Sequence, residues 1–302
     1  MMRISGIHHV TGIAGPAAKN VAFYTHVLGL RLVKRTINFD DPGTWHLYYG
    51  SETGEPGTIL TFFPYEQARQ GRAGNGNVAE TSISVQDDAL DTWLERFAEV
   101  RGAGQHGPFD FRPITERFGD RVLRFRDPNG LNLALVGRSS TPALGSFDGV
   151  TLQVSETEPT ARLLEEVLGL ERGAEEGART RFLTGNGSRV DLETGTDLPR
   201  MGAGTIHHVA FRVANDEEQL AWRERVISAG IPVTEVKDRN YFRSIYFREP
   251  GGVLFEIATD PPGFTVDESV QSLGQTLKLP DWLEPHRSRI EQRLPSLDSV
   301  PA

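Results

Sequence analysis

The chain has 302 residues, of which 38% are hydrophobic and 24% charged, so it can bury the cores of about two domains. Its formal net charge of -9 argues against nucleic acid or an anionic membrane as the main partner. The absence of cysteine excludes disulfides, thiolate metal sites and cysteine nucleophiles. The opening MMRISGIHHV has no apolar signal core, and no run approaches about 18 apolar residues, so we expect a cytoplasmic protein.

Four copies of one strand–helix–strand–strand–strand pattern follow in chain order. The first opens with IHHVTGIA, continues with the helical stretch PAAKNVAFYTHVLGL and closes with RLVKRTINF, TWHLYYG and GTILTFFPY. The second runs from NVAETSISV through the helical LDTWLERFAEV to RVLRFRDPNG and LNLALVG. The third runs from GVTLQVSE to SRVDLETG, and the fourth from TIHHVAFRV to VLFEIAT. The opening strands begin near residues 7, 78, 148 and 206, so each module spans roughly 60–70 residues.

Local similarities indicate that the chain is a duplicated pair of modules. FYTHVLGLRLV in the first copy matches LLEEVLGLERG in the third, and RFRDPNGLNLALV in the second matches YFREPGGVLFEIA in the fourth. In the latter two, a turn rich in Pro and Gly joins two strands in a hairpin. The segment 137–149, rich in Ser, Gly and Pro, is the expected linker. We predict an α+β fold of four βαβββ modules, with an N-terminal domain at 1–138, a C-terminal domain at 147–262 and a tail ending in an amphipathic helix at 263–302.

The histidines point to a metal site. Ile-His-His-Val occurs twice, at His8–His9 and His207–His208, each time on the opening strand of a module. Adjacent strand residues point to opposite faces, so one histidine of each pair faces the concave side of the sheet, and we favour the second. Glu256 has apolar neighbours on the closing strand of the fourth module. Burying it as a free carboxylate costs several kcal/mol unless a cation compensates.

Two imidazoles and one carboxylate give a divalent metal three ligands on one face and leave positions open for substrate and dioxygen. The third module contains no histidine, so the second imidazole has to come from the N-terminal half. We therefore predict that His9, His208 and Glu256 bind one metal, and that the first module forms its cup with the fourth rather than with its neighbour in sequence. The positions that match Glu256 in the other modules are Thr61 or Phe62, Ala134 and Glu193.

At these residues the sequence resembles the vicinal oxygen chelate superfamily, which includes glyoxalase I, bleomycin-resistance proteins and type I extradiol dioxygenases. Within it, the chain is similar to the ring-cleaving dioxygenases specific for hydroquinones. The likeness covers nearly the whole chain and is carried by IHHVTGIAG, FYTHVLGLRLVKRTINFDDPGTWHLYYG, PGTILTFFP, TIHHVAFRV, DRNYFRSIYFREPGGVLFEIATDPPGFTVDE and LPDWLE. The string YFREPGGVLFEIATD with IHHVAF ahead of it is specific, whereas FYTHVLGL marks only the superfamily.

The resemblance implies that His9, His208 and Glu256 bind iron(II), or manganese in some members, which agrees with the placement from the strand pattern. It also implies catalytic roles for the residues at five further positions: His8, Thr11, His207, Arg239 and Tyr246. The implied reaction is the oxygen-dependent opening of a hydroquinone ring. The partners are then a small aromatic substrate and dioxygen, and a homodimer is the default assembly.

Other residues have weaker assignments. Arg239 could face the distal hydroxyl or an anionic substituent of the ring, although a solvated surface position fits nearly as well. Asp40 and Asp41 are interpreted as solvated loop residues. Three residues of an interior strand in the first module could line a wall, but core packing is the preferred interpretation: Trp45, His46 and Tyr48.

Two other classes of function fit the same fold. A glyoxalase-like isomerase or lyase needs a second carboxylate as base on a matching strand, where Thr61 or Phe62 and Ala134 stand instead. A metal-free binding protein would not need His9, His208 and Glu256 together.

Overall fold

The computed structural model describes all residues except 1, 105–108, 140, 142–143 and 299–302. The first module comprises β1 (Gly6–Ala14), α1 (Ala17–Ala22) with the π-helical turn η1 (Phe23–Val27), β2 (Arg31–Asn38), β3 (Asp41–Gly50) and β4 (Ile59–Pro64). The second comprises β5 (Asn77–Gln86), α2 (Ala89–Gly102), β6 (Asp110–Phe111), β7 (Thr115–Arg117), β8 (Asp120–Arg126) and β9 (Asn132–Arg138).

The third module comprises β10 (Phe147–Val154), α3 (Thr157–Arg162) with η2 (Leu163–Val167), β11 (Glu171–Glu176), β12 (Arg179–Leu183) and β13 (Arg189–Thr194). The fourth comprises β14 (Thr205–Val213), α4 (Asp216–Ser228), β15 (Lys237–Asp238), β16 (Arg243–Arg248) and β17 (Leu254–Thr259). The tail contains the single turns η3 (Phe264–Val266), η4 (Val270–Ser272) and η5 (Glu284–His286) and the short helix α5 (Arg287–Glu291). The predicted α+β fold of four βαβββ modules is confirmed, with one additional short strand in the second.

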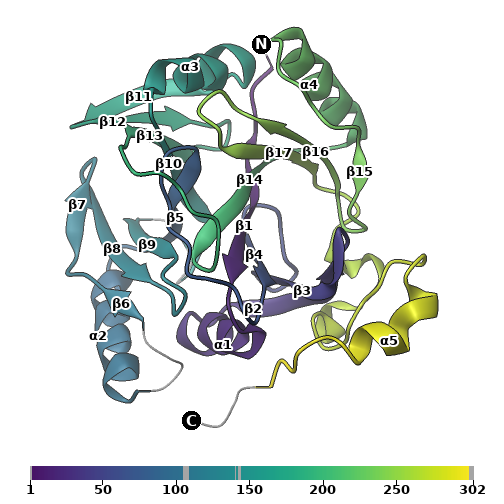
Figure 1. The fold of residues 1–302 in the computed structure, drawn as a ribbon. Coiled ribbons are helices and arrows are strands. Elements are labelled where there is room, and N and C mark those ends of the chain that lie inside the picture. The colour runs from purple at the N-terminus through teal and green to yellow at the C-terminus, as the bar shows by residue number, and fades with distance from the viewer. Residues whose placement is uncertain (1, 105–108, 140, 142–143, 299–302) are drawn as a thin grey trace.

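The strands form two large sheets, and each sheet takes strands from both halves of the chain. The first has the order β15-β16-β17-β14-β1-β4-β3-β2, so the first and fourth modules share it, as predicted. The second has the order β11-β12-β13-β10-β5-β9-β8-β6 and joins the third module to the second. Figure 1 shows β1 and β14 side by side in the middle of the molecule, with α1 to α4 at its periphery. The division into 1–138, 147–262 and 263–302 stays a prediction, and residues 140 and 142–143 of the predicted linker lie outside the described residues.

The two hairpin turns that the sequence predicts have a matching construction. The carboxylate of Asp127 accepts hydrogen bonds from the backbone of Asn129 and Leu131, and Glu249 does the same at Gly251 and Val253. Each turn is completed by a glycine in the left-handed region that other residues avoid, with φ of 83° at position 130 and 100° at position 252.

Each of these turn acids also binds the preceding module. Tyr24 of η1 donates a hydrogen bond to Asp127 at 3.0 Å, and Thr160 of α3 donates one to Glu249 at 2.6 Å. Both contacts are buried, so the first module is joined to the second, and the third to the fourth, by polar contacts although the two modules of each pair belong to different sheets.

The tail covers the outer strands of the first module. Ile37 of β2 packs in a small apolar cluster with residues of the tail: Leu279, Leu283 and Ile290. The indole Nε1 of Trp45 donates to the carbonyl of Pro295 at 2.8 Å, which confirms the preferred core position of this residue. Phe39, in the β2–β3 turn, lies edge-on to Trp282 with ring centroids 6.4 Å apart. The tail therefore supports the turn that borders the cavity described below.

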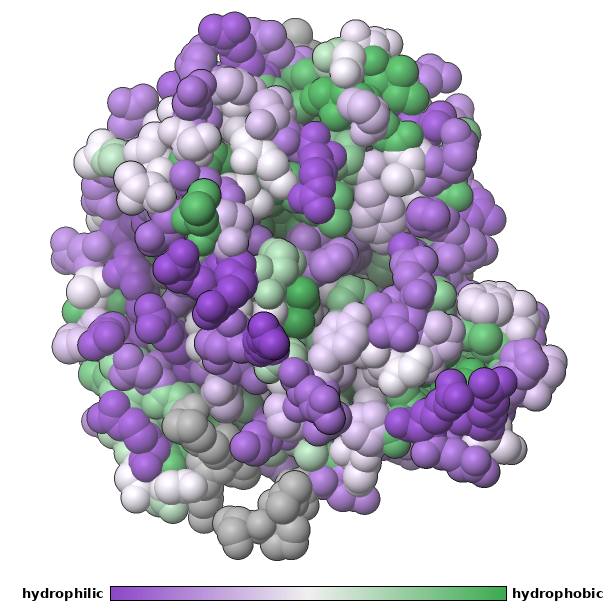
Figure 2. Space-filling model, viewed as in Figure 1, coloured by the Kyte–Doolittle hydropathy of each residue, from purple (hydrophilic) through white to green (hydrophobic). Residues whose placement is uncertain are grey.

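Hydrophilic side chains cover most of the face seen in Figure 2, with apolar residues gathered in small patches between them. Among the described residues, no helix is both long enough and apolar enough to span a bilayer.

Candidate metal centre

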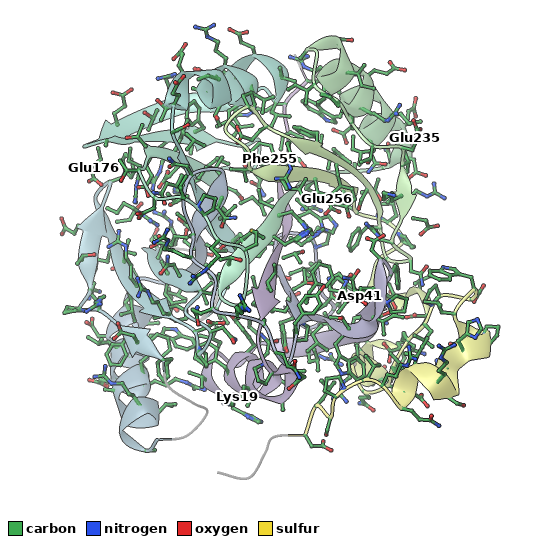
Figure 3. All side chains as sticks on the ribbon, viewed as in Figure 1. Lys19, Asp41, Glu176, Glu235, Phe255 and Glu256 are labelled. Carbon is green, nitrogen blue, oxygen red and sulfur yellow. The ribbon has the colours of Figure 1, made fainter. Side chains whose placement is uncertain are left out.

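The register of the first sheet places the predicted ligands in one cluster. His9 of β1 pairs with Ala210 of β14, which in turn pairs with Glu256 of β17. One step along the same strands, Thr11 pairs with His208. Because alternate residues share a face, all four polar side chains point to the same side of the sheet. In Figure 3, Glu256 lies on β17, on the part of the sheet that faces β3.

The distances fit one metal ion. The Nε2 atoms of His9 and His208 lie 3.3 Å apart, and they are 3.3 Å and 2.9 Å from Oε2 of Glu256. The ligand atoms of the three residues all lie within 4.8 Å of one another, and all three side chains are buried. This is the group that could hold a metal ion among the described residues. The placement of these three residues next to one another agrees with the sequence prediction.

The first histidine of each pair contacts the ring of the second and so fixes its orientation. Nδ1 of His8 lies 2.9 Å from Nδ1 of His9, and Nδ1 of His207 lies 2.7 Å from Nδ1 of His208. A hydrogen bond between two such nitrogens requires one proton between them. When that proton belongs to His9 or His208, its Nε2 lone pair is free to bind a metal.

The charges of the cluster are incomplete without a cation. Burial lowers the pKa of His208, so this imidazole is neutral at pH 7. Burial alone would raise the pKa of Glu256, but His9 and His208 lower it well below its usual range. Its Oε1 accepts a hydrogen bond from Ser244, whereas Oε2 is buried without a hydrogen-bond donor. No lysine or arginine in the described part of the chain forms an ion pair with it. A divalent cation fits this position because it supplies the missing charge.

A cavity of about 160 Å³ adjoins the cluster. This is close to the roughly 150 Å³ of an engineered cavity that holds benzene, so it suits a single substituted ring. Its lining residues are His9, Ile13, Asn38, Phe39, Asp40, His46, Tyr48, Phe63, Tyr65, His207, His208, Arg239, Phe242 and Tyr246. The walls are therefore mostly aromatic, and the ligand atoms of two histidines lie on one side.

The other predicted site residues lie around the cluster. Thr11 is buried, and its Oγ1 is 2.8 Å from Nε2 of His208. His8 lies behind His9 and does not line the cavity, whereas His207 does. Tyr246 accepts a hydrogen bond from Nε of Arg239 at 3.1 Å, and burial raises its pKa.

Two residues of β3, His46 and Tyr48, line the cavity, although the sequence favoured a core position for them. The core position is wrong for His46, whereas Tyr48 packs in a buried apolar cluster and also lines the cavity. They are two positions apart and share a face, and Tyr48 pairs with Thr61 of β4, which pairs with Thr11. His46 contacts the hydroxyls of Tyr48 and Thr61, so both of its ring nitrogens are used. The two-residue alternation from the predicted His9–Thr11 face could have identified this row.

The second sheet has the same register without the ligands. By strand pairing, Glu80 occupies the position of His208, Gly149 that of His9 and Ala134 that of Glu256. Glu80 is ion-paired with Arg117 and Arg124 rather than with a metal.

Neighbouring charges on this sheet are paired in the same way. Arg181 binds Asp191 through two hydrogen bonds, of 2.7 Å and 2.9 Å. Glu193, the acid noted in the third module, accepts from Arg179. Ion pairs therefore fill the place that the metal ligands take in the first sheet.

Comparison with known proteins identifies the family. Residues 6–135 and 146–257 match the model of the Glyoxalase/Bleomycin resistance protein/Dioxygenase superfamily. The chain belongs to this superfamily. The resemblance inferred from the histidine pairs and the closing-strand glutamate is thereby confirmed.

Superfamily members of known sequence match over almost the full length. "Putative ring-cleaving dioxygenase MhqO" of Bacillus subtilis is 47% identical, over 96% of this chain and 95% of that protein. The chlorohydroquinone/hydroquinone 1,2-dioxygenase of Sphingobium indicum is 32% identical over 93% of each chain. The crystal structure of a protein described as "putative dioxygenase" from Bacillus subtilis superimposes with a TM-score of 0.92 at 44% identity, covering 99% of this chain and 100% of that one. Glyoxalase I from Zea mays, at 15% identity and a TM-score of 0.63 over 84% of this chain and 92% of that one, shares the fold.

Proposed function

We propose that this protein is a metal-dependent dioxygenase that opens the ring of hydroquinones with dioxygen. In this proposal His9, His208 and Glu256 hold iron(II), or manganese(II). When bound there, such an ion lowers the pKa of a coordinated phenol and provides the redox-active centre that dioxygen chemistry requires. Both atoms of one dioxygen enter the product as one carbon–carbon bond of the ring breaks, so no other reductant is consumed.

One observation carries the proposal. A three-residue group of ligand atoms lies within 4.8 Å of one another, and two of its members, His9 and His208, line a cavity of about 160 Å³ that suits a single aromatic ring. The names of the relatives point to the same chemistry, since one acts on hydroquinones and another is named for ring cleavage.

The protein's own side chains position the ring. Phe39, Phe63 and Phe242 supply apolar walls that exclude water. The two hydroxyls of a hydroquinone are para to each other, so only one can reach the ligand cluster. The opposite end of the ring then has to be held by other polar groups of the cavity, where Arg239 and Tyr246 are hydrogen-bonded to each other.

His207 is the side chain placed to exchange a proton with the substrate. It lines the cavity, and burial lowers its pKa to about 4, so the imidazole is neutral at pH 7. When Nδ1–H of His208 donates to Nδ1 of His207, Nε2 of the neutral His207 carries the ring proton and can donate it to a substrate oxygen.

The glyoxalase-like alternative is disfavoured by one position. Pairing of Thr11 with Thr61, and of Ala210 with Glu256, makes Thr61 the counterpart of Glu256 across the β1–β14 pair. A second carboxylate, needed there as a base, is replaced by a hydroxyl that contacts His46.

An oxygen electrode tests the proposal. Protein loaded with iron(II) or manganese(II) is mixed with hydroquinone, methylhydroquinone or chlorohydroquinone, and separately with methylglyoxal plus a thiol. The variant Glu256→Gln removes a ligand charge, and Glu193→Gln is its matched control, because Glu193 lies on the closing strand of the third module, in the other sheet.

We expect one dioxygen consumed per hydroquinone by the wild type and by Glu193→Gln, and none by Glu256→Gln. Isomerisation of the thiol adduct of methylglyoxal, without oxygen uptake from any diol, would overturn the proposal and favour the glyoxalase-like class.

A further inference from the structure

The rim of the cavity carries one ion pair between segments far apart in the chain. Asp40, in the β2–β3 turn, accepts a hydrogen bond of 3.1 Å from Nη2 of Arg239, which follows β15. The Arg239 side chain is 18% exposed and that of Asp40 is 70% exposed. Asp40 is solvated, as expected, but it also lines the cavity. Arg239 is mostly buried, so the alternative interpretation of it as a solvated surface residue is wrong.

The Nε–Nη2 edge of Arg239 is occupied. A guanidinium binds a carboxylate best through two parallel N–H groups, and Nε with Nη2 forms such an edge. In this structure Nε donates to the hydroxyl of Tyr246 and Nη2 donates to Asp40. This edge is therefore already used, and the carboxylate of Asp40 would lie beside an anion bound to the rest of the guanidinium.

The charge of Arg239 is also balanced. Arg239 is the sole lysine or arginine among the described residues that line the cavity, and Asp40 is the sole carboxylate there. An anionic substituent placed near Arg239 would therefore lie near Asp40 as well. The carboxylate of Asp40 would repel that substituent, and the repulsion between two negative charges is stronger in a partly buried site than in water.

The neighbouring residues hold Asp40 in place. The backbone N–H of Asp40 donates to the side chain of Asn38, and Phe39 packs against Trp282 of the tail. The carboxylate is therefore part of an ordered turn that borders the cavity, and its position does not depend on the long side chain of Arg239 alone.

We propose that Asp40 is a specificity-determining residue that restricts the site to hydroquinones with uncharged substituents and rejects those bearing a carboxylate. This inference rests on the proposed function. The sequence left open whether Arg239 meets a distal hydroxyl or an anionic group, and the geometry assigns it to the uncharged partner.

The test compares methylhydroquinone with 2,5-dihydroxybenzoate, two para-diols that differ in the charge of one substituent. Oxygen uptake by the iron(II)-loaded protein gives kcat/KM for each, and inhibition of methylhydroquinone turnover by 2,5-dihydroxybenzoate gives a binding constant. The variant is Asp40→Asn, whose amide oxygen can still accept from Arg239. The control is Asp41→Asn, which removes the adjacent acid of the same turn, one that bonds to Thr44 and does not line the cavity.

We expect the wild type to prefer methylhydroquinone, and Asp40→Asn to shift both the kcat/KM ratio and the binding constant toward the carboxylated diol by about tenfold. Asp41→Asn should leave the ratio unchanged. Equal use of the two diols by the wild type, or the same ratio in Asp40→Asn, would overturn the inference while leaving the proposed function intact. Turnover of neither diol by the wild type would overturn both.

Discussion

Replacing Glu256 by Gln is predicted to stabilise the metal-free protein and at the same time to weaken metal binding. The carboxylate is buried, with Oε2 lacking a donor. A glutamine at this position can donate its two amide hydrogens toward Nε2 of His9 and Nε2 of His208, which lie 3.3 Å and 2.9 Å from the present oxygen. Its carbonyl can still accept from Ser244.

The two effects have opposite signs and separate magnitudes. Replacing the charged and unsatisfied Oε2 of Glu256 by an amide should raise the free energy of unfolding of the metal-free protein by about 1–3 kcal/mol. For a chain of this length that corresponds to a rise of about 2–5 °C in the melting temperature. Loss of the anionic ligand should weaken metal binding by more than about 100-fold, since residues that only orient ligands already contribute about 10–100-fold.

Thermal melts with and without metal separate the two effects. In a chelator the variant should melt above the wild type. At a manganese(II) concentration of about 100 times the wild-type Kd, the wild type gains about 2.7 kcal/mol and the variant about 0.4 kcal/mol or less, so the metal shifts the difference in stability by about 2.3 kcal/mol toward the wild type. Glu193→Gln, which breaks an ion pair with Arg179 outside the site, should show the wild-type metal response.

A lower melting temperature of Glu256→Gln in chelator, or an undiminished shift with manganese(II), would refute this reasoning. The first result would mean that Glu256 is satisfied without a metal, and the second that the metal lies elsewhere.

Three further predictions follow from buried polar contacts. Asp127→Ala removes the acceptor of two backbone N–H groups and of the Tyr24 hydroxyl, and should lower the free energy of unfolding by about 2–4 kcal/mol in urea titrations. His8→Phe removes the contact that orients His9 and should weaken metal binding by about 10–100-fold in calorimetry, with apoprotein stability changed less. Burial lowers the pKa of His207 to about 4, so below about pH 6.5 the unfolded chain binds more protons at this position than the folded one. Apoprotein stability should therefore fall as the pH is lowered from 6.5 to 4, and a flat profile over that range would contradict the assignment.

The sequence predicts much of the framework because the framework depends on local patterns. Strand alternation placed His9 and Thr11 on one face, and the repeated Ile-His-His-Val located the matching strand. The lack of histidine in the third module then implied that the first and fourth modules share a sheet, which the pairing of β1 with β14 confirms. The turn acids Asp127 and Glu249 likewise occur where the Pro and Gly of each hairpin predict them.

The cavity could not be predicted in the same way because it depends on contacts between distant segments. Asp40 and Arg239 are 199 positions apart, and their ion pair requires the β2–β3 turn to meet the loop after β15. The tail supports that turn through Trp282, a contact without a sequence signature. His46 was interpreted as a core residue because nothing local distinguishes a histidine that faces a cavity from one that is packed in a core.

Anomalous X-ray diffraction from crystals of the iron(II)-loaded protein, collected at the iron edge, tests the central claim most directly. The account predicts one peak about 2.0–2.2 Å from Nε2 of His9, Nε2 of His208 and Oε2 of Glu256. A fully loaded crystal with its peak at other side chains, or with no peak between these three, would contradict it.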